Sequence, residues 1–172
     1  MTDTPRPLDA IDRRILGELC QKADLSFAEL GDRVGLSAPA THERVKRLRA
    51  DGRIKGTAAQ LDGPSIGKPL LAFVHVDTSG WGKSPELMDL TELPELEEMH
   101  SVTGDTCMLL KVRLQSSQAL EGFLARLYKI TGVRATRSYV ALSTYLERGV
   151  QAGISEELLL DRTYPSTGEE GG

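Results

Sequence analysis

Apolar residues in the first third of the chain recur every three or four positions, the spacing of one face of an α-helix. The first such stripe comprises Leu8, Ile11, Ile15, Leu16 and Leu19. Asp9 is placed to cap this helix, and the capping-box spacing of Ser26–Glu29 opens a second helix that ends at Gly35. Ser37 caps a third helix that runs to about Ala50. Two helices joined by a turn of about four residues around Gly35 predict a helix-turn-helix.

The third helix is expected to turn one stripe inward and its basic side outward. Its inward positions are Thr41, Val45 and Leu48. Past the stop at Gly52, the stretch to Leu61 is interpreted as a small hairpin or wing.

After a segment rich in glycine and proline over 61–69, the hydrophobic period changes to that of strands. We expect strands over 70–76, 96–103, 107–114 and 136–146. A short helix from Ser84 to Pro94 is expected after the first strand, with Leu87, Met88 and Leu93 inward, and a second helix over 117–130 before the last strand. In the last strand, Val140, Leu142 and Leu146 are expected to face inward. The order βαββαβ predicts a ferredoxin-like antiparallel sheet with both helices on one face. A short helix over 154–160 and a mobile tail over 163–172 are expected to follow.

The predicted class is therefore α+β, a winged helix-turn-helix domain followed by a ferredoxin-like βαββαβ domain. A length of 172 residues suits two small domains. We place the first over 1–60, a linker over 61–69, the second over 70–150, and a short helix and tail over 151–172.

The net charge of −4 hides an asymmetry between these parts. Residues 1–60 hold 11 basic and 9 acidic side chains, a net of +2, whereas 61–172 hold 10 and 16, a net of −6. Within 37–56 alone, six basic residues face two acidic ones. Such a split indicates that the N-terminal part contacts nucleic acid.

The basic third helix is a candidate for the major groove of double-stranded DNA. Its first turns are expected near base edges, through Ser37, Ala38, Pro39, Thr41 and His42. The phosphate contacts are expected from Arg44, Lys46, Arg47, Arg49 and Arg53, although Arg44 also follows Glu43 and could form a structural salt bridge. A merely solvated helix, or one that docks a protein, is the alternative.

The composition also excludes several classes of protein. No apolar run approaches the length of a membrane helix, and no secretory signal begins the sequence, so we expect a cytoplasmic location and no membrane. Cys20 and Cys107 lie in different segments without metal-ligand spacing, and both are interpreted as buried thiols. An enzyme would have to use His75, His100, Asp105 or Cys107, but no nucleophile–base spacing or phosphate loop accompanies them. We therefore expect no catalytic residue, no metal and no cofactor.

The sheet face opposite the helices needs a cover. It is expected to carry Cys107, Leu109, Tyr139, Ala141 and Tyr145, mixed with Lys111 and Arg113. This face is too apolar to be fully exposed to solvent, and a second copy of the same sheet is the simplest partner to cover it. We predict a homodimer through the C-terminal domains, which would present two reading helices to two DNA half-sites.

The stretch from Leu8 to Gly56 resembles the DNA-binding domain of the leucine-responsive regulatory protein/AsnC (Lrp/AsnC) family of prokaryotic transcription regulators. The resemblance rests on Leu8-Asp9-x-Ile11-Asp12, Leu36-Ser37, Arg44-Val45-x-Arg47-Leu48 and Gly52-x-Ile54. It covers about 50 residues without a gap. The resemblance implies a sequence-specific, ligand-responsive DNA-binding regulator.

The second half resembles the effector-binding (RAM) domain of the same family. The motifs are Thr103-Gly104 with the strand that follows, and Gly132-Val133-x-x-Thr136-x-Ser138. The resemblance implies a small-molecule effector, often an amino acid, at the contact between dimers that assemble into tetramers or octamers. The residues it implies are Gly104, Asp105, Thr106, Cys107, Thr136 and Ser138.

One position departs from that pattern. The aspartate usual in the family falls at Cys107, and Asp105 is a candidate substitute. An orphan regulator without an amino-acid effector therefore stays open, with Gly104 in a plain β-turn. So does a stand-alone metabolite-sensing or protein-interaction module.

Overall fold

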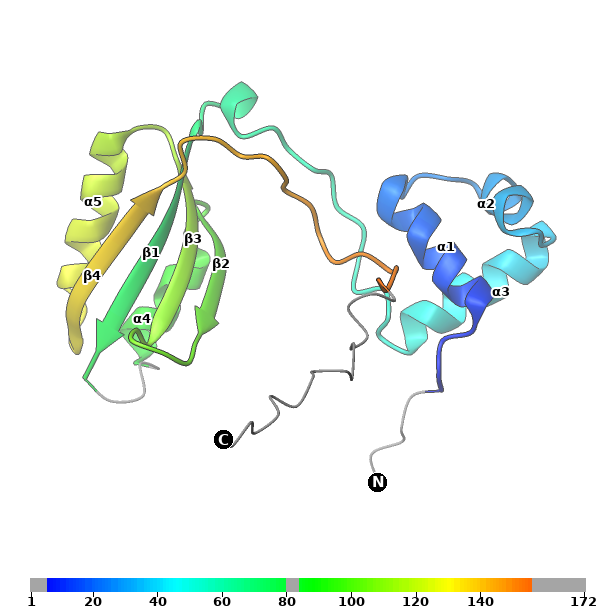
Figure 1. The fold of residues 1–172 in the computed structure, drawn as a ribbon, viewed down its shortest axis with the longest axis horizontal. Helices are drawn as coiled ribbons and strands as arrows, with labels where there is room; N and C mark the ends of the chain where they lie inside the picture. The colour runs from blue at the N-terminus through cyan, green and yellow to red at the C-terminus, as the bar shows by residue number, and fades with distance from the viewer. Residues whose placement is uncertain (1–5, 80–83, 156–172) are drawn as a thin grey trace, which may run out of the picture. The chain divides into compact units, whose positions relative to one another are not determined.

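The computed structural model describes residues 6–79 and 84–155, which form two compact units (Figure 1). Of the described residues, 6–58 and 147–155 form one unit, and 59–79 and 84–146 form the other. The return of the chain to the first unit was not foreseen. It rests on contacts to the first helix: Arg13 donates to the carbonyl of Ala152 at 3.3 Å, and the Cys20 thiol lies 3.5 Å from that of Val150.

Three helices make up the first unit: α1 (Ala10–Gln21), α2 (Phe27–Val34) and α3 (Ala38–Ala50). The predicted caps are confirmed. The side chain of Asp9 accepts from the backbone N–H of Asp12 at 2.7 Å, Ser26 and Glu29 form the reciprocal capping box, and Ser37 caps α3. The core that these helices enclose contains Ile15, Leu25, Leu30, Val34, Val45 and Leu48.

The turn between α2 and α3 is tightly packed. Gly35 ends α2 with a φ of +76°, in the left-handed region that favours glycine. Gly31, one turn earlier, accepts the backbone N–H of Leu36 at 2.9 Å. A Cβ on Gly31 would lie 2.5 Å from the carbonyl oxygen of Leu36 and 3.0 Å from the hydroxyl of Thr41, so this position excludes any side chain.

The predicted wing is wrong. In the described part of the chain no strand precedes Leu70, and the segment after α3 runs on without a hairpin partner. Ile54 alone packs onto the helical core, whereas residues 55–61 are exposed. Small and polar side chains such as Thr57 and Ala58 offer no apolar face against which a second strand could pair.

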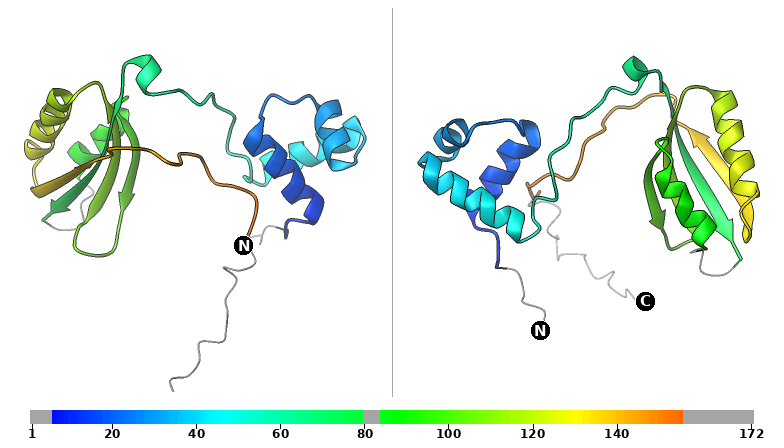
Figure 2. Two further views of the ribbon diagram at one scale, coloured as in Figure 1. Left: turned by 45° about the horizontal axis from the view of Figure 1, so that its top comes forward. Right: turned by 180° about the vertical axis from the view of Figure 1, so that it is seen from behind.

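The second unit is a four-stranded antiparallel sheet with two helices on one face (Figures 1 and 2). Its elements in chain order are β1 (Leu70–Thr78), α4 (Pro85–Met88), β2 (Leu96–Ser101), β3 (Met108–Leu114), α5 (Ser117–Tyr128) and β4 (Val133–Val140), with single 3₁₀ turns at Pro64–Ile66 and Asp89–Glu92. The strand order β2-β3-β1-β4 confirms the predicted ferredoxin-like βαββαβ topology.

Alternate residues of β1 and β3 fill the space between sheet and helices. The buried set is Ala72, Val74, Val76, Leu87, Leu90, Met108, Leu110, Val112, Leu114, Leu120, Phe123 and Leu127. Leu87 of α4 and Leu90 of the 3₁₀ turn that follows are buried, whereas Met88, which we expected inside, is exposed. Cys20 was also expected inside and is exposed, while Cys107 is half-buried.

The last strand is shifted from its prediction. It begins at Val133 and ends at Val140, because β1 begins at Leu70 and offers no partner further along. The bond from the Ala141 N–H to the carbonyl of Leu71 is the last rung. Val140, Leu142 and Leu146, which we expected in the core, are exposed, and Tyr145, which we expected on the open face, lies beyond the end of the strand.

Two further expectations concern the end of the chain and membranes. The helix predicted over 154–160 and the tail over 163–172 fall largely outside the described residues. Among the helices of the described chain, none is both long and apolar enough to span a bilayer.

The close approach at Gly31 gives a test of this packing. We expect Gly31→Ala to lower the stability of the first unit by about 1–3 kcal/mol, because the backbone at Leu36 cannot move away without breaking the turn. Gly17→Ala, in α1, is the matched control: a Cβ there meets open space, and alanine should stabilise the helix by about 0.5–1 kcal/mol. Urea unfolding of both variants measures the difference, and equal effects would contradict the close approach.

Candidate nucleic-acid interface and small-molecule pocket

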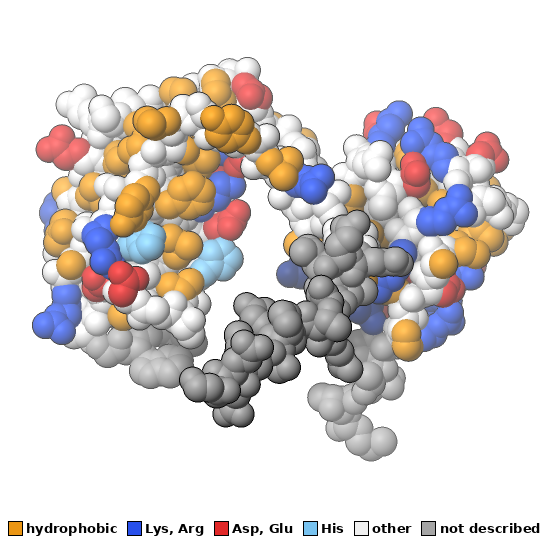
Figure 3. Space-filling view, in the orientation of Figure 1, with side chains coloured by type: hydrophobic (Ala, Val, Ile, Leu, Met, Phe, Trp, Pro, Cys, Tyr) orange, Lys and Arg blue, Asp and Glu red, His pale blue; other side chains and the backbone are white. Residues whose placement is uncertain are grey.

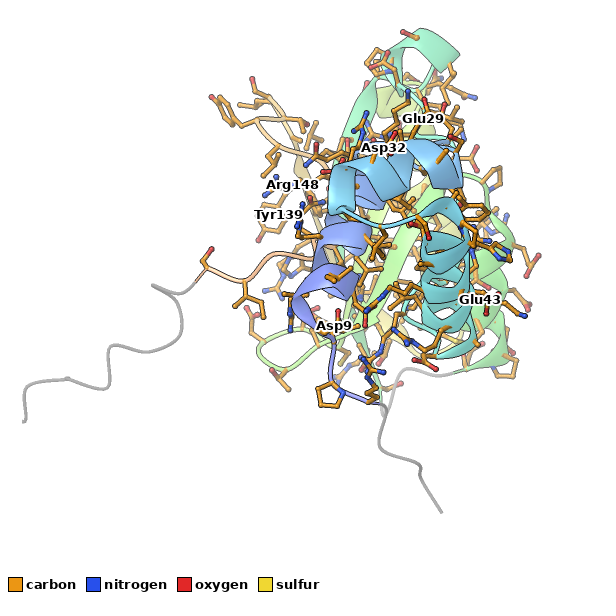
Figure 4. All side chains as sticks on the ribbon, turned by 90° about the vertical axis from the view of Figure 1, so that its right-hand side faces the viewer. Asp9, Glu29, Asp32, Glu43, Tyr139 and Arg148 are labelled. Carbon is orange, nitrogen blue, oxygen red and sulfur yellow. The ribbon has the colours of Figure 1, made fainter. Side chains whose placement is uncertain are left out.

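The outer side of α3 forms an exposed surface. It comprises Pro39, Ala40, His42, Glu43, Lys46 and Arg49, with Ser37 at the cap and Ala38 half-buried. Figure 4 shows Glu43 on the side of α3 that faces away from α1. Within the described residues, Lys46 and Arg49 form no ion pair, so both ammonium and guanidinium groups stay available to an anionic partner. Ala40, which the sequence reading left out, belongs to this surface.

Two of the predicted phosphate-binding residues point elsewhere. Arg44 donates to Asp9 at 2.7 Å and to Asp12 at 2.8 Å, and Arg47 donates to Asp12 at 3.0 Å. The Asp12 side chain is only 4% exposed. Arg44 therefore does form a structural salt bridge, but with acids of α1 and its cap rather than with Glu43.

The electrostatics of this cluster favour its charged form. The hydrogen bond from Arg44, followed by that from the backbone N–H of Asp12, lowers the pKa of Asp9 below its usual value. The same bond from Arg44 to Asp9, and then the one to Asp12, raises the pKa of the Arg44 guanidinium. Figure 4 shows Asp9 at the start of α1, next to α3. The cluster thus fixes α3 on α1.

Thr41, His42 and Arg53, which were also predicted to contact DNA, each form contacts within the protein. Thr41 is fully buried and its hydroxyl donates to the carbonyl of Ser37 at 3.0 Å, so it is not placed to contact base edges. The His42 ring packs edge-on against Phe27, with 4.8 Å between centroids, and remains half-exposed. Arg53 donates to the backbone carbonyl of Arg6 at 3.1 Å, which ties the chain after α3 to the N-terminal segment.

An open pocket of about 540 Å³ lies at one end of the sheet in the second unit. It is lined by Asp77, Thr78, Gly104, Asp105, Thr106, Cys107, Arg134 and Ala135. Gly104 has a φ of +127°, and the Thr106 hydroxyl donates to the carbonyl of Val76 at 3.2 Å. Four of the six predicted effector residues, Gly104 to Cys107, are therefore gathered here.

The other two predicted residues face the opposite way. Thr136 and Ser138 pair with Val76 and Val74, whose side chains are in the core, so all four point to the helix side of the sheet. Thr136 accordingly donates from its N–H and hydroxyl to the Tyr128 hydroxyl of α5, at 3.3 and 3.1 Å. Neither residue lines the pocket.

The sequence did not point to three charged residues at this end of the sheet: Asp77 and Arg134 line the pocket, and Arg137 contacts its lining residue Asp105. Arg137 lies between Thr136 and Ser138 and donates to the carboxylate of Asp105 at 3.3 Å and to its carbonyl at 3.2 Å. Asp77 pairs with Ala135 and Thr78 with Val133, so Arg134 is the extra residue of a β-bulge that opens onto the pocket. The strand alternation would have identified Arg137, but nothing local in the sequence marks the bulge.

The sheet face opposite the helices has no cover in the second unit, and Figure 3 looks onto it. Hydrophobic side chains and histidines gather over the strands, with acidic and basic groups among them. Phe73, His75, Leu109 and Tyr139 form its apolar part, and the rings of His75 and Tyr139 lie 5.1 Å apart. Lys111 and Arg113 form ion pairs with Glu97 at 3.1 and 2.5 Å, and Lys111 also lies 3.5 Å from Glu98, so acids of β2 pair with the basic groups of this face.

Family models match both units. Residues 8–49 match the AsnC-type helix-turn-helix domain, and residues 71–151 match the Lrp/AsnC ligand binding domain. The chain belongs to the Lrp/AsnC family. It is 38% identical to the leucine-responsive regulatory protein of Escherichia coli K12, over 80% of this chain and 86% of that protein. It is 33% identical to the transcriptional regulator FL11 of Pyrococcus horikoshii, over 82% of this chain and 93% of that one.

Solved Lrp/AsnC structures share the fold. A transcriptional regulator of Neisseria meningitidis in complex with L-methionine superposes with a TM-score of 0.77 at 26% identity, covering 90% of this chain and all of that one. Escherichia coli AsnC gives 0.76 at 26% identity, covering 84% and 99%. This Lrp/AsnC protein is thus a helix-turn-helix transcription regulator with a ligand-binding domain, in a family of regulators and not of enzymes.

The buried carboxylate of Asp12 gives the test of the cluster between α1 and α3. We expect Asp12→Asn to destabilise the first unit by about 2–3 kcal/mol, because Arg44 and Arg47 lose their shared counter-charge while partly shielded from water. Asp32→Asn, on the exposed side of α2, is the control and should stay within about 0.5 kcal/mol of the parent. Chemical denaturation followed by circular dichroism measures both. Equal stability of the two variants would remove the structural role assigned to Asp12.

Proposed function

We propose that this protein binds specific sequences of double-stranded DNA through the exposed side of α3. The observation that carries the proposal is that only some of the basic residues of that helix are ion-paired within the protein. Arg44 and Arg47 are engaged with acids of the first unit, whereas Lys46 and Arg49 project outward without a partner in the described chain. Ser37, Ala38, Pro39, Ala40 and His42 at the start of the helix are then the candidates for contact with base edges.

The open face of the sheet supports a homodimer. An apolar centre at Phe73, Leu109 and Tyr139 with charged groups around it has the composition of a protein interface. Two copies packed face to face would bring two α3 helices to half-sites one DNA turn, or a multiple of it, apart. The family resemblance further implies that dimers associate into tetramers or octamers. Residues 61–69 would then link the DNA-binding domain to the domain that forms the dimer.

The pocket at Gly104–Cys107 is the proposed effector site. An amino acid is the favoured class, because the Neisseria relative was solved with L-methionine. Ligand binding regulates DNA affinity only if the ligand prefers one arrangement of the assembled protein over another. Gly104 and Asp105 in a plain turn, without a ligand, would make the protein an orphan regulator. With DNA as its partner, the protein works in the cytoplasm.

The proposed DNA surface predicts unequal effects of basic residues. We expect Lys46→Ala and Arg49→Ala each to weaken binding to the operator about tenfold at low salt, and to reduce the slope of log affinity against log salt by about 1. Lys22→Ala removes an equally exposed charge of the same unit, away from α3, and should change neither quantity. Gel-shift titrations at several salt concentrations with the protein's own upstream region test this. Equal loss for Lys22→Ala would point to a diffuse charge effect rather than to α3.

The proposed dimer predicts unequal effects of two tyrosines. Tyr139 lies on the open face and Tyr128 on the far side of the sheet in α5, and they are 55% and 57% exposed. We expect Tyr139→Arg to shift the protein to monomer, because two copies would bury two unpaired guanidinium charges across the two-fold axis. Tyr128→Arg should leave the assembly intact. Sedimentation velocity distinguishes the two, and an unchanged assembly for Tyr139→Arg would exclude this face as the interface.

A further inference from the structure

Glu43 is the only acidic residue of α3. With about 100° of rotation per residue, it lies about 170° round the helix from the mean direction of the buried residues Thr41, Val45 and Leu48. Its side chain is 69% exposed, and Figure 4 shows it turned away from α1. A partner that lies along the exposed side of α3 therefore meets this carboxylate at the centre of the contact.

The carboxylate of Glu43 has no lysine or arginine partner in the described part of the protein. Arg47 stands at the i+4 spacing at which a glutamate and a basic residue commonly pair, but it donates to Asp12 at 3.0 Å instead. Lys46, three positions after Glu43, forms no ion pair in the described residues either. His42 brings its Nδ1 to 3.5 Å from Oε1 of Glu43, so a protonated ring would pair with one oxygen and leave the other open. The carboxylate is thus available to a donor outside the protein.

A free carboxylate in this place is unfavourable next to the phosphates of DNA, which it repels. In the major groove, the hydrogen-bond donors are the amino groups of cytosine and adenine. The amino group of adenine lies beside the N7 acceptor, whose lone pair repels a carboxylate, and guanine and thymine present only acceptors and a methyl group. The amino group of cytosine lies beside a C–H group. Cytosine is therefore the base whose edge suits a glutamate best.

We propose that Glu43 is a specificity-determining residue, whose carboxylate accepts a hydrogen bond from the N4 amino group of a cytosine in each half-site of the operator. The proposal rests on the proposed DNA-binding role of α3 and adds the base that this helix selects. Glu43 lies in the second turn of α3, within the N-terminal part from which a recognition helix reaches base edges. Any other base at this position leaves the carboxylate desolvated without a donor, so such a site is bound more weakly.

The test selects binding sequences for the full-length protein from a randomised double-stranded library and then measures affinities by gel shift. We expect the selected half-sites to contain a C·G pair whose replacement by any other pair weakens binding by the parent at least about tenfold. Glu43→Gln keeps the length of the side chain but can bond both N6 and N7 of adenine, so it should prefer an A·T pair at that position. Glu43→Ala should bind all four variants of that position within about threefold of one another, and unrelated DNA about threefold more tightly than the parent at low salt.

Asp51→Asn is the matched control, because it removes one exposed negative charge from the C-terminal end of the same helix, about 12 Å further along the axis. It should leave the preferred base at every position unchanged, even if it binds all DNA somewhat more tightly. If the Glu43 variants change affinity for all sequences alike, as this control does, Glu43 acts only as a general charge and the assignment is overturned. The same holds if the base preference that Glu43→Ala loses is not for cytosine. If the parent enriches no sequence from the library, the proposed function itself is refuted, whereas enriched sites that the Glu43 variants share with the parent refute the role of Glu43 alone.

Discussion

The buried carboxylate of Asp12 is the interaction on which the DNA-binding unit depends. The basic helix α3 must be held at a fixed angle on the rest of the unit, and apolar packing, which is not directional, does not by itself fix that angle. Asp12 adds directional bonds to Arg44 and Arg47, while Asp9 caps α1 and accepts from the same Arg44. Two acids at one end of α1 thereby orient the whole of α3, and with it the side chains presented to a partner.

Periodicity predicted the helices of the first unit almost to the residue, because their ends carry capping side chains whose chemistry is local. Asp9, Ser26 and Ser37 each bond within three residues, so the sequence contains the complete signal. The roles of Arg44 and Arg47 were not readable in that way. Their partners lie more than thirty residues earlier, and a basic helix in a sequence does not reveal which of its charges are already neutralised.

The same distinction explains the second unit. The alternation of β3 predicted which of its side chains face the helices and which face the open side, since this strand is paired on both sides. The end of β4 depends on where its neighbour β1 begins, and the apolar residues Leu142 and Leu146 carry no information about that position. The bulge at Asp77 and Thr78 has a similar origin: it is a property of the pairing and not of either strand alone. For that reason the sequence identified Gly104 as a residue of the pocket but not Arg134 or Asp77.

The neutralisation of Arg44 and Arg47 has a kinetic consequence for a protein that must search a genome. Attraction to any DNA grows with the number of phosphates that free cations can reach, and α3 offers Lys46 and Arg49 rather than four such groups. A single DNA-binding unit should therefore dissociate quickly from non-specific DNA. Long residence then requires two readers held together, because the second binds at the high local concentration that the first provides. Internal salt bridges would in this way make occupancy of an operator depend on assembly.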